Sequence, residues 1–237
     1  MDTLLDMLVD ERIPAGLGGR WYGVYPATVS AIKGDPDGLG RVQVTLPWTP
    51  DPGGGTYQAW ARVATLMGGK NRGTWFVPDQ GDEVLVAFEG GDSRRPFVLG
   101  GLWNGTDKPP ETMDGAGQNY KKVIRSRNGV KLTLDDTDGK ETLTLETPGG
   151  NKLKLADGPG SIEISDSNGN SIKLQTSGIT ITASAKVTIT ASNVNVSAGM
   201  VKADAGMAKF SGVVQSSTAL ASSVVGGTYT PGAGNFL

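Results

Sequence analysis

The residues that most resemble a site for chemistry are the carboxylates of residues 135–139, which read Asp-Asp-Thr-Asp-Gly. Three carboxylates so close together could hold a cation, or could act as acid and base in a β-helical enzyme that cleaves polysaccharides. The spacing does not fit an EF-hand loop, which needs a Glu at its twelfth position. Because Asp-Gly is a strong turn pair, the sequence favours a hairpin turn at this point.

Two other stretches resemble sites for phosphate or nucleic acid. Residues 66–71 read Leu-Met-Gly-Gly-Lys-Asn, but a phosphate-binding loop would need Gly in place of Ala64 and Ser or Thr in place of Asn71. A basic run follows and consists of Lys121, Lys122, Arg125, Arg127 and Lys131. Single-stranded nucleic acid would need exposed aromatic rings beside these charges, and only Tyr120 lies near. We therefore expect no nucleic acid and interpret the run as a solvated collar where chains converge.

The composition excludes several other kinds of site. The chain has 237 residues, with no Cys and no His. A disulfide framework, a zinc site of thiolates and imidazoles, and a Ser-His-Asp or Cys-His nucleophile are therefore ruled out. The 22 basic and 24 acidic side chains give a net charge of −2, which does not favour an anionic partner. We expect no catalytic residue, no cofactor and no metal, and we expect that the protein is not an enzyme.

The elements that carry these residues are taken in chain order. Residues 1–20 are predicted to form a helix and an arm. Leu4 and Leu8 stand at helical spacing, which predicts a short helix over residues 3–12 with Asp2 as its N-cap. The apolar side chains of this helix could dock on a hub protein or on the chain's own barrel, and the sequence leaves both open. Acidic residues interrupt the leucines, so no signal peptide is expected and assembly should take place in the cytoplasm. No apolar run approaches the roughly 20 residues of a membrane span.

Residues 21–105 are expected to form a small β-barrel. Short alternating segments, separated by Gly-, Pro- and Asp-rich turns, predict strands at residues 21–32, 41–48, 60–66, 74–78, 82–88 and 95–103. In the second of these, Val42, Val44 and Leu46 should share one face. Five or six short strands in about 80 residues are typical of a small barrel. Residues 106–120 are rich in Pro, Gly and polar residues and indicate a linker.

Residues 121–209 have a different composition, with no aromatic residue and with turn signals about every 8 to 11 residues. Between the turns, Leu, Ile or Val alternates with Thr, Ser, Lys or Glu, which predicts strands at residues 130–134, 141–146, 152–155, 161–164, 171–174, 179–182, 187–190 and 194–196. The sequence offers no layer to cover the aliphatic face of such an array. Either one chain coils around its own core, or several chains wrap around a common axis.

We favour three wrapped chains, because a solenoid with so few residues per coil is too thin to enclose a core. The fold class is therefore all-β, with a barrel followed by an intertwined trimeric β-helix, here called the needle. The residues expected in the trimer core are Ile172, Leu174, Ile179, Ile181, Val187, Ile189, Val194 and Val196. Threonine pairs such as Thr180 and Thr182 would also suit an adhesive solenoid, although β-branched residues favour strands in general.

Residues 22–110 carry a pattern that resembles a known family. The segments YGVYPATV, DPDGLGRVQVTLPW and WARVATLMGGKNRGTWFVPDQGDEVLVAFEGGDSRRPFVLGGLWNGTDKPP are similar to the OB-fold domain of phage baseplate assembly protein V and of VgrG-type spikes. The resemblance implies a homotrimeric spike at the centre of a contractile baseplate, which punctures the target membrane. It implies a baseplate hub protein on the N-terminal side. The spike would belong to a virion, a secretion system or a released injection particle.

The resemblance also implies a tip at residues 210–237. Some members carry a lysozyme domain before the needle, but residues 106–120 leave no room for one. Others seal the tip with an iron held by His, which this chain lacks. We therefore expect a separate capping protein of the PAAR-repeat kind, although tails that fold back and cap the trimer remain an alternative. The expected docking residues are Ser223, Val224, Val225, Tyr229, Thr230, Pro231, Asn235, Phe236 and Leu237.

Overall fold

The computed structural model describes residues 20–50, 55–158 and 160–227. The chain divides into two units after Lys186, and each is described by itself. The expected helix over residues 3–12 lies outside the described residues, as does the end of the tip from residue 228 onward. In the described ranges the only helical element is the short 3₁₀ helix η1 (Glu89–Gly91), so the protein is all-β there.

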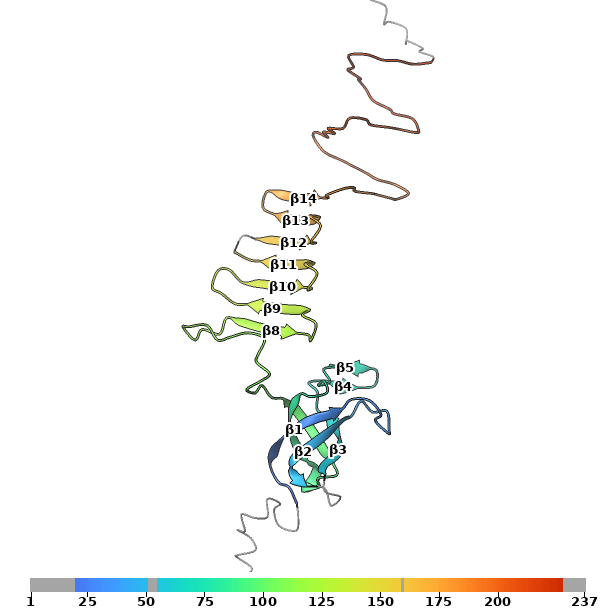
Figure 1. Ribbon diagram of the computed structural model, residues 1–237. Coiled ribbons are helices and arrows are strands. Elements are labelled where there is room, and N and C mark those ends of the chain that lie inside the picture. The colour runs from blue at the N-terminus through green and yellow to red at the C-terminus, as the bar shows by residue number, and fades with distance from the viewer. Residues whose placement is uncertain (1–19, 51–54, 159, 228–237) are drawn as a thin grey trace, which may run out of the picture. The chain divides into compact units, whose positions relative to one another are not determined.

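Five strands close into a barrel in the order β1-β2-β3-β7-β6 (Figure 1). They are β1 (Val24–Ala31), β2 (Val42–Pro50), β3 (Thr56–Val63), β6 (Glu83–Phe88) and β7 (Pro96–Gly101). β1 pairs antiparallel with β2 on one side and with β6 on the other. The parallel pairing of β3 with β7 completes the ring, so no strand edge of the barrel is left open. This confirms the expected barrel.

The barrel interior is filled by small and branched aliphatic side chains from alternate strand positions. Val42, Val44 and Leu46 are fully buried and share one face of β2, as predicted. The residues exposed by at most 2% include Ala27, Val29, Val42, Val44, Leu46, Ala61, Val84, Val86, Pro96 and Val98. Alternation along a strand places every second side chain inside, which is why the period-two pattern located the core.

Aromatic rings pack against this core. Trp21 and Trp48 have ring centroids 4.2 Å apart, and Tyr25 lies 4.9 Å from Trp48. The indole N–H of Trp48 donates to the carbonyl oxygen of Pro26 at 2.8 Å. The amide of Trp21 donates to the carbonyl oxygen of Gly91 at 2.8 Å, so η1 is tied to the segment that enters β1.

The loop between β1 and β2 is held by one carboxylate. Asp35 accepts hydrogen bonds from the amides of Leu39 at 2.7 Å and Arg41 at 3.1 Å, and from Nε of Arg41 at 2.8 Å. The amide of Gly38 donates to the carbonyl oxygen of Asp35 at 3.2 Å, which closes the Gly-, Pro- and Asp-rich turn expected between the first two barrel strands. The loop therefore carries Leu39 in a fixed position beside the barrel.

One predicted barrel strand is wrong. Residues 74–78 contain no strand, because the amide of Thr74 donates to Met67 rather than to a neighbouring strand, and Trp75 and Phe76 are exposed. The structure instead has a short hairpin of β4 (Gly68–Gly69) and β5 (Arg72–Gly73) just before this segment. Its turn contains Asn71 at φ 53°.

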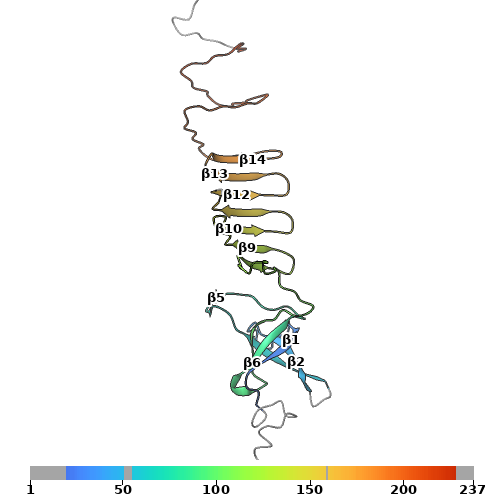
Figure 2. The ribbon, with the colours of Figure 1, turned by 90° about the vertical axis from the view of Figure 1, so that its left-hand side faces the viewer.

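The second part of this unit is a seven-stranded sheet in sequence order, and each strand pairs antiparallel with the next (Figures 1 and 2). The strands are β8 (Lys121–Arg125), β9 (Lys131–Asp135), β10 (Thr142–Glu146), β11 (Lys152–Ala156), β12 (Ser161–Ser165), β13 (Ser171–Gln175) and β14 (Gly178–Thr182). Six of them match the predicted segments, whereas β8 was interpreted only as a basic collar. Strand partners over residues 121–182 therefore come from the same chain.

The two predicted strands at residues 187–190 and 194–196 are not present in the single chain. From Val187 to Gly227 every residue is exposed, and none forms a strand ladder with any other described part of the chain. Figure 1 shows this segment as an extended trace that doubles back without forming ladders. Alternating aliphatic residues form a strand only when a partner supplies the ladder, and within the described residues this chain supplies none.

We predict that Gly91→Ala destabilises the barrel more than Gly90→Ala. Both glycines have left-handed backbones, at φ 78° and 57°, so either substitution costs about 1 kcal/mol. A Cβ at buried Gly91 would lie 3.1 Å from the amide nitrogen of Trp21, whereas at Gly90 it would meet only the end of the Arg20 side chain at 3.6 Å. The added crowding should bring Gly91→Ala to about 2–4 kcal/mol. Urea unfolding followed by tryptophan fluorescence would measure both, and equal losses would contradict the packing.

We also predict that Asp35 stabilises the barrel in a pH-dependent way. Partial burial acts to raise the pKa of Asp35, but the Arg41 guanidinium and the surrounding amides outweigh it and hold the pKa well below its usual value. A depressed pKa stabilises the fold above the ordinary carboxyl pKa near 4, and the effect is lost as the pH falls. Wild type should therefore exceed Asp35→Asn in melting temperature at pH 7, and the gap should narrow below about pH 4. Asp204→Asn, at an exposed position outside the barrel, serves as the control. Its melting temperature should equal that of wild type at both pH values.

Candidate trimerisation surface

The strand register gathers the aliphatic side chains of the sheet into two columns on one face. Directly paired residues share a face, and so do residues two apart in a strand. The first column is Ile124, Leu132, Leu145, Leu153, Ile164, Ile172 and Ile181, and the second is Leu134, Leu143, Leu155, Ile162, Leu174 and Ile179. We call these thirteen side chains the aliphatic face.

The aliphatic face is open to solvent in the single chain. Even near the middle of the sheet, Leu145 and Leu155 are 39% and 36% exposed, and at its end Ile179 and Ile181 reach 71% and 61%. A covered sheet face would bury such side chains almost completely. Monomeric proteins rarely leave so long a continuous aliphatic surface in water, so this face indicates contact with another chain.

The opposite face of the sheet is suited to water. Its central column pairs Thr144 with Lys154, and then Lys154 with Glu163. Glu163 in turn pairs with Lys173, and Lys173 with Thr180. Opposite charges in directly paired positions stabilise a sheet by roughly 0.2–1 kcal/mol per pair. The sheet therefore has one face that water can solvate and one that it cannot.

The residues expected in the trimer core fall into two groups. Ile172, Leu174, Ile179 and Ile181 lie together on the aliphatic face. The other four, which are Val187, Ile189, Val194 and Val196, belong to the unpaired segment and are 57–73% exposed. Their facing stays a prediction. The residues expected in the trimer core did not include the nine members of the aliphatic face from Ile124 to Ile164. The same alternation in residues 130–164 could have identified most of them.

The carboxylate run at residues 135–139 forms a turn between β9 and β10. Hydrogen bonds from the hydroxyl and the amide of Thr137, at 2.6 and 3.1 Å, hold the pKa of Asp135 below its usual value. The amide of Lys140 donates to the carbonyl oxygen of Thr137 at 2.8 Å, which closes the turn. Within the described ranges, no three carboxylates converge as they would around a metal ion.

The basic run lies on β8, in the turn that follows it and at the start of β9. Lys122 pairs with Asp136 at 3.1 Å and Lys131 with Glu111 at 3.9 Å, so part of its charge is compensated locally. Side chains of this kind on a sheet edge keep it soluble and oppose unwanted strand pairing.

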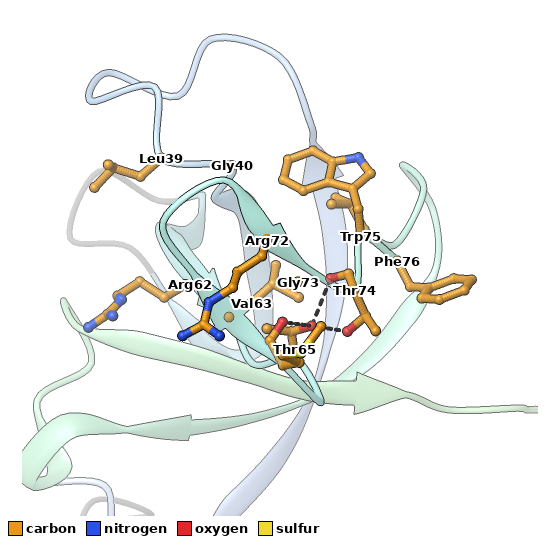
Figure 3. A pocket seen from close by; sticks show the side chains of 14 residues that line it. Leu39, Gly40, Arg62, Val63, Thr65, Arg72, Gly73, Thr74, Trp75 and Phe76 are labelled. Carbon is orange, nitrogen blue, oxygen red and sulfur yellow. Dashed lines mark hydrogen bonds between the residues drawn. The ribbon is translucent and has the colours of Figure 1, made fainter.

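The barrel carries a pocket that the sequence did not predict. A depression of about 870 Å³ lies between the β1–β2 loop, β3 and the β4–β5 hairpin, and we call it the barrel pocket. Leu39, Met67, Trp75 and Phe76 line it together with Arg62 and Arg72 (Figure 3). The Trp75 ring stands against Gly40, where a Cβ would come within 2.8 Å of it. Gly68 and Gly69, which resembled a phosphate loop, form strand β4 here.

The described part of the tip is fully open to solvent. Val224 and Val225 are 75% and 97% exposed, and Ser223 is exposed as well. The remaining residues expected to dock a capping protein, which are Tyr229, Thr230, Pro231, Asn235, Phe236 and Leu237, lie outside the described residues. No helix in the described ranges has the length and hydropathy needed to span a bilayer.

Comparison with known proteins finds two domain families in the chain. Residues 25–103 match the Type VI secretion system/phage-baseplate injector OB domain. Residues 142–202 match the phage baseplate V C-terminal trimerisation domain, which covers β10 to β14 and the start of the unpaired segment. The two models match 79 and 61 residues, together 140 of the 237.

Curated relatives match about half of the chain. The Type VI secretion system spike proteins VgrG1a and VgrG5 of Pseudomonas aeruginosa are 32% and 35% identical over 133 and 135 residues, which is 52% of this chain in each case. The actin cross-linking toxin VgrG1 of Vibrio cholerae is 30% identical over 128 residues, or 50% of this chain. The matched regions are only 21%, 17% and 12% of these relatives. With both an injector OB domain and a baseplate V trimerisation domain, the chain belongs to the phage baseplate V and VgrG-type spike proteins.

Proposed function

We propose that this protein is the homotrimeric central spike of a contractile injection system. The observation that carries the proposal is the aliphatic face, because ten of its thirteen side chains lie inside the region matched by the trimerisation domain. Three such sheets, each turning this face toward a common axis, would form a prism with a dry interior and a polar exterior. Each sheet would keep its own hydrogen bonds, so the three chains would meet mainly through side chains.

Beyond Thr182 the mode of assembly would change. The segment from Val187 to Gly227 has aliphatic residues and no strand partner within the described part of its own chain. We expect its backbone groups to pair with the other two copies, which would wrap the chains around one another and remove open edges. Only four charged residues follow Leu174, which lowers the cost of passing the tip into a bilayer.

The partners follow from this placement. The barrel side would join a baseplate hub protein, and the far end would carry a conical tip protein of the PAAR kind. Val224 and Val225 would form part of the docking surface, because a prism of strands must end in open amides and exposed aliphatic groups. The work of such a spike is mechanical, so we propose no catalytic role. No specific observation favours the polysaccharide-cleaving or adhesive alternatives.

We predict that the purified chain is a trimer. Native mass spectrometry at micromolar concentration should give three times the chain mass of 24.6 kDa. The reason is that the aliphatic face and the unpaired segment both need other copies. A folded monomer that stays soluble at this concentration would contradict the proposal.

We predict that Ile181→Asp breaks the trimer while Thr180→Asp does not. Ile181 pairs with Ile172 on the aliphatic face, whereas Thr180 pairs with Lys173 on the opposite face. Near a three-fold axis the first change would bury three unpaired carboxylates, each costing several kcal/mol. The second change places a carboxylate beside an ammonium group and should alter stability by at most about 0.5 kcal/mol. Thermal melting with mass measurement would compare the two adjacent positions, and similar melting temperatures would refute this facing.

A further inference from the structure

The barrel pocket leaves an unusual amount of apolar surface in water. Leu39 and Trp75 are 70% and 77% exposed, and Phe76 and Met67 are 71% and 50% exposed. All four side chains belong to the β1–β2 loop or to the segments on either side of the β4–β5 hairpin, and none belongs to the barrel core. The β1–β2 loop is fixed by Asp35, and the Trp75 ring rests on Gly40, so the pocket walls are already in place before anything binds.

The same pocket has a positive border. Among the residues that the structure describes, Arg62 and Arg72 are the only charged ones that line it, and none of its described lining residues is a carboxylate. Arg62 lies over the ring of Phe97 with its guanidinium carbon 5.4 Å from the ring centroid, and Arg72 folds back over Gly69. Among the residues that the structure describes, neither guanidinium forms an ion pair. The pocket therefore suits a ligand with an apolar side and a negative side.

The chain itself contains a segment with this chemistry. Residues 2–11 read Asp-Thr-Leu-Leu-Asp-Met-Leu-Val-Asp-Glu, with five apolar and four acidic side chains and no basic one. At about 100° per residue, a helical segment would place Asp2, Asp6 and Asp10 within an arc of about 80°. Leu4, Leu5 and Leu8 would lie on another side, within an arc of about 100°.

We propose that residues 2–11 occupy the barrel pocket of their own chain. Leu4, Leu5 and Leu8 would contact Trp75 and Met67, and the aspartates would face Arg62 and Arg72. The link to Arg20 is residues 12–19, which can extend to roughly 27 Å. This length is comparable to the roughly 30 Å diameter of a domain of about 80 residues. Because the segment is tethered to the barrel, its local concentration at the pocket exceeds that of a free ligand, so weaker contacts are enough to fill the pocket.

The absence of Cys from the chain allows a direct test by disulfide cross-linking in the full-length trimer. Leu5→Cys combined with Met67→Cys should form an intrachain disulfide under mild oxidation. The control pairs Leu5→Cys with Val24→Cys, an exposed position close to the tether but outside the pocket. We expect the pocket pair to close at least about tenfold faster than the control, because docking adds to tether proximity. Equal rates would overturn the proposal, and covalently linked dimers would overturn its assignment to the same chain.

Charge reversal provides the second test. Arg72 is exposed, so Arg72→Glu should leave the fold and the trimer mass unchanged while slowing closure of the pocket pair severalfold. Adding Asp6→Lys to Arg72→Glu should restore much of the rate, whereas a purely structural effect of Arg72→Glu would not be rescued. Failure to rescue would contradict the charge pairing.

Aromatic rings beside arginines are also the chemistry that holds single-stranded nucleic acid. A fluorescent oligothymidine distinguishes that occupant in the same full-length protein. Binding at micromolar concentration that is lost in Trp75→Ala, together with no preferred cross-link at residue 5, would assign the pocket to nucleic acid and overturn the proposal. Because native mass spectrometry reports the trimer separately, failure of this inference would not be mistaken for failure of the spike assignment.

Discussion

The structure depends on one constraint, which is an aliphatic sheet face that the chain has no layer to cover. Seven antiparallel strands satisfy their own backbone, but they leave thirteen Leu and Ile side chains on one side. Water solvates the Thr, Lys and Glu residues of the other side. The free energy that should hold the assembled spike together is therefore hydrophobic burial between chains, while hydrogen bonds within each chain set the shape of the surfaces that meet.

The two parts of the first unit solve the problem of strand edges in different ways. The barrel closes on itself, so its core of Val, Leu and Ala is complete in one chain. The sheet stays open, and its strands become less covered toward β14, where Ile179 and Ile181 are the most exposed. Past Lys186 the chain pairs with nothing in its described part. The share of apolar side chains and backbone groups that find partners within one chain thus decreases toward the C-terminus. This fits a protein whose N-terminal domain folds alone and whose C-terminal part needs other copies of the chain.

The errors of the sequence-based prediction have physical causes. Residues 74–78 have the composition of a strand, but the β4–β5 hairpin takes the hydrogen bond of Thr74 and leaves Trp75 outside. Residues 187–196 keep the alternation of the preceding strands, yet alternation specifies a face and not a partner. Lys121–Arg125 forms a strand because it pairs with β9, although its charges suggested only a collar. In each case the structure of the segment depended on whether a partner outside it was present in the described chain.

The sequence by itself determined the all-β class and the buried faces of the barrel strands. It also separated the aromatic-containing barrel from the aromatic-free strand array that follows, because alternation, turn residues and aromatic content are local properties. It also located the turn at residues 135–139, since Asp-Gly favours that geometry wherever it stands. Only the tertiary structure decided the register that aligns Ile164, Ile172 and Ile181 in one column, and the pocket that Leu39 and Trp75 both line. Both join residues distant in sequence, and no local pattern specifies which distant residues will meet.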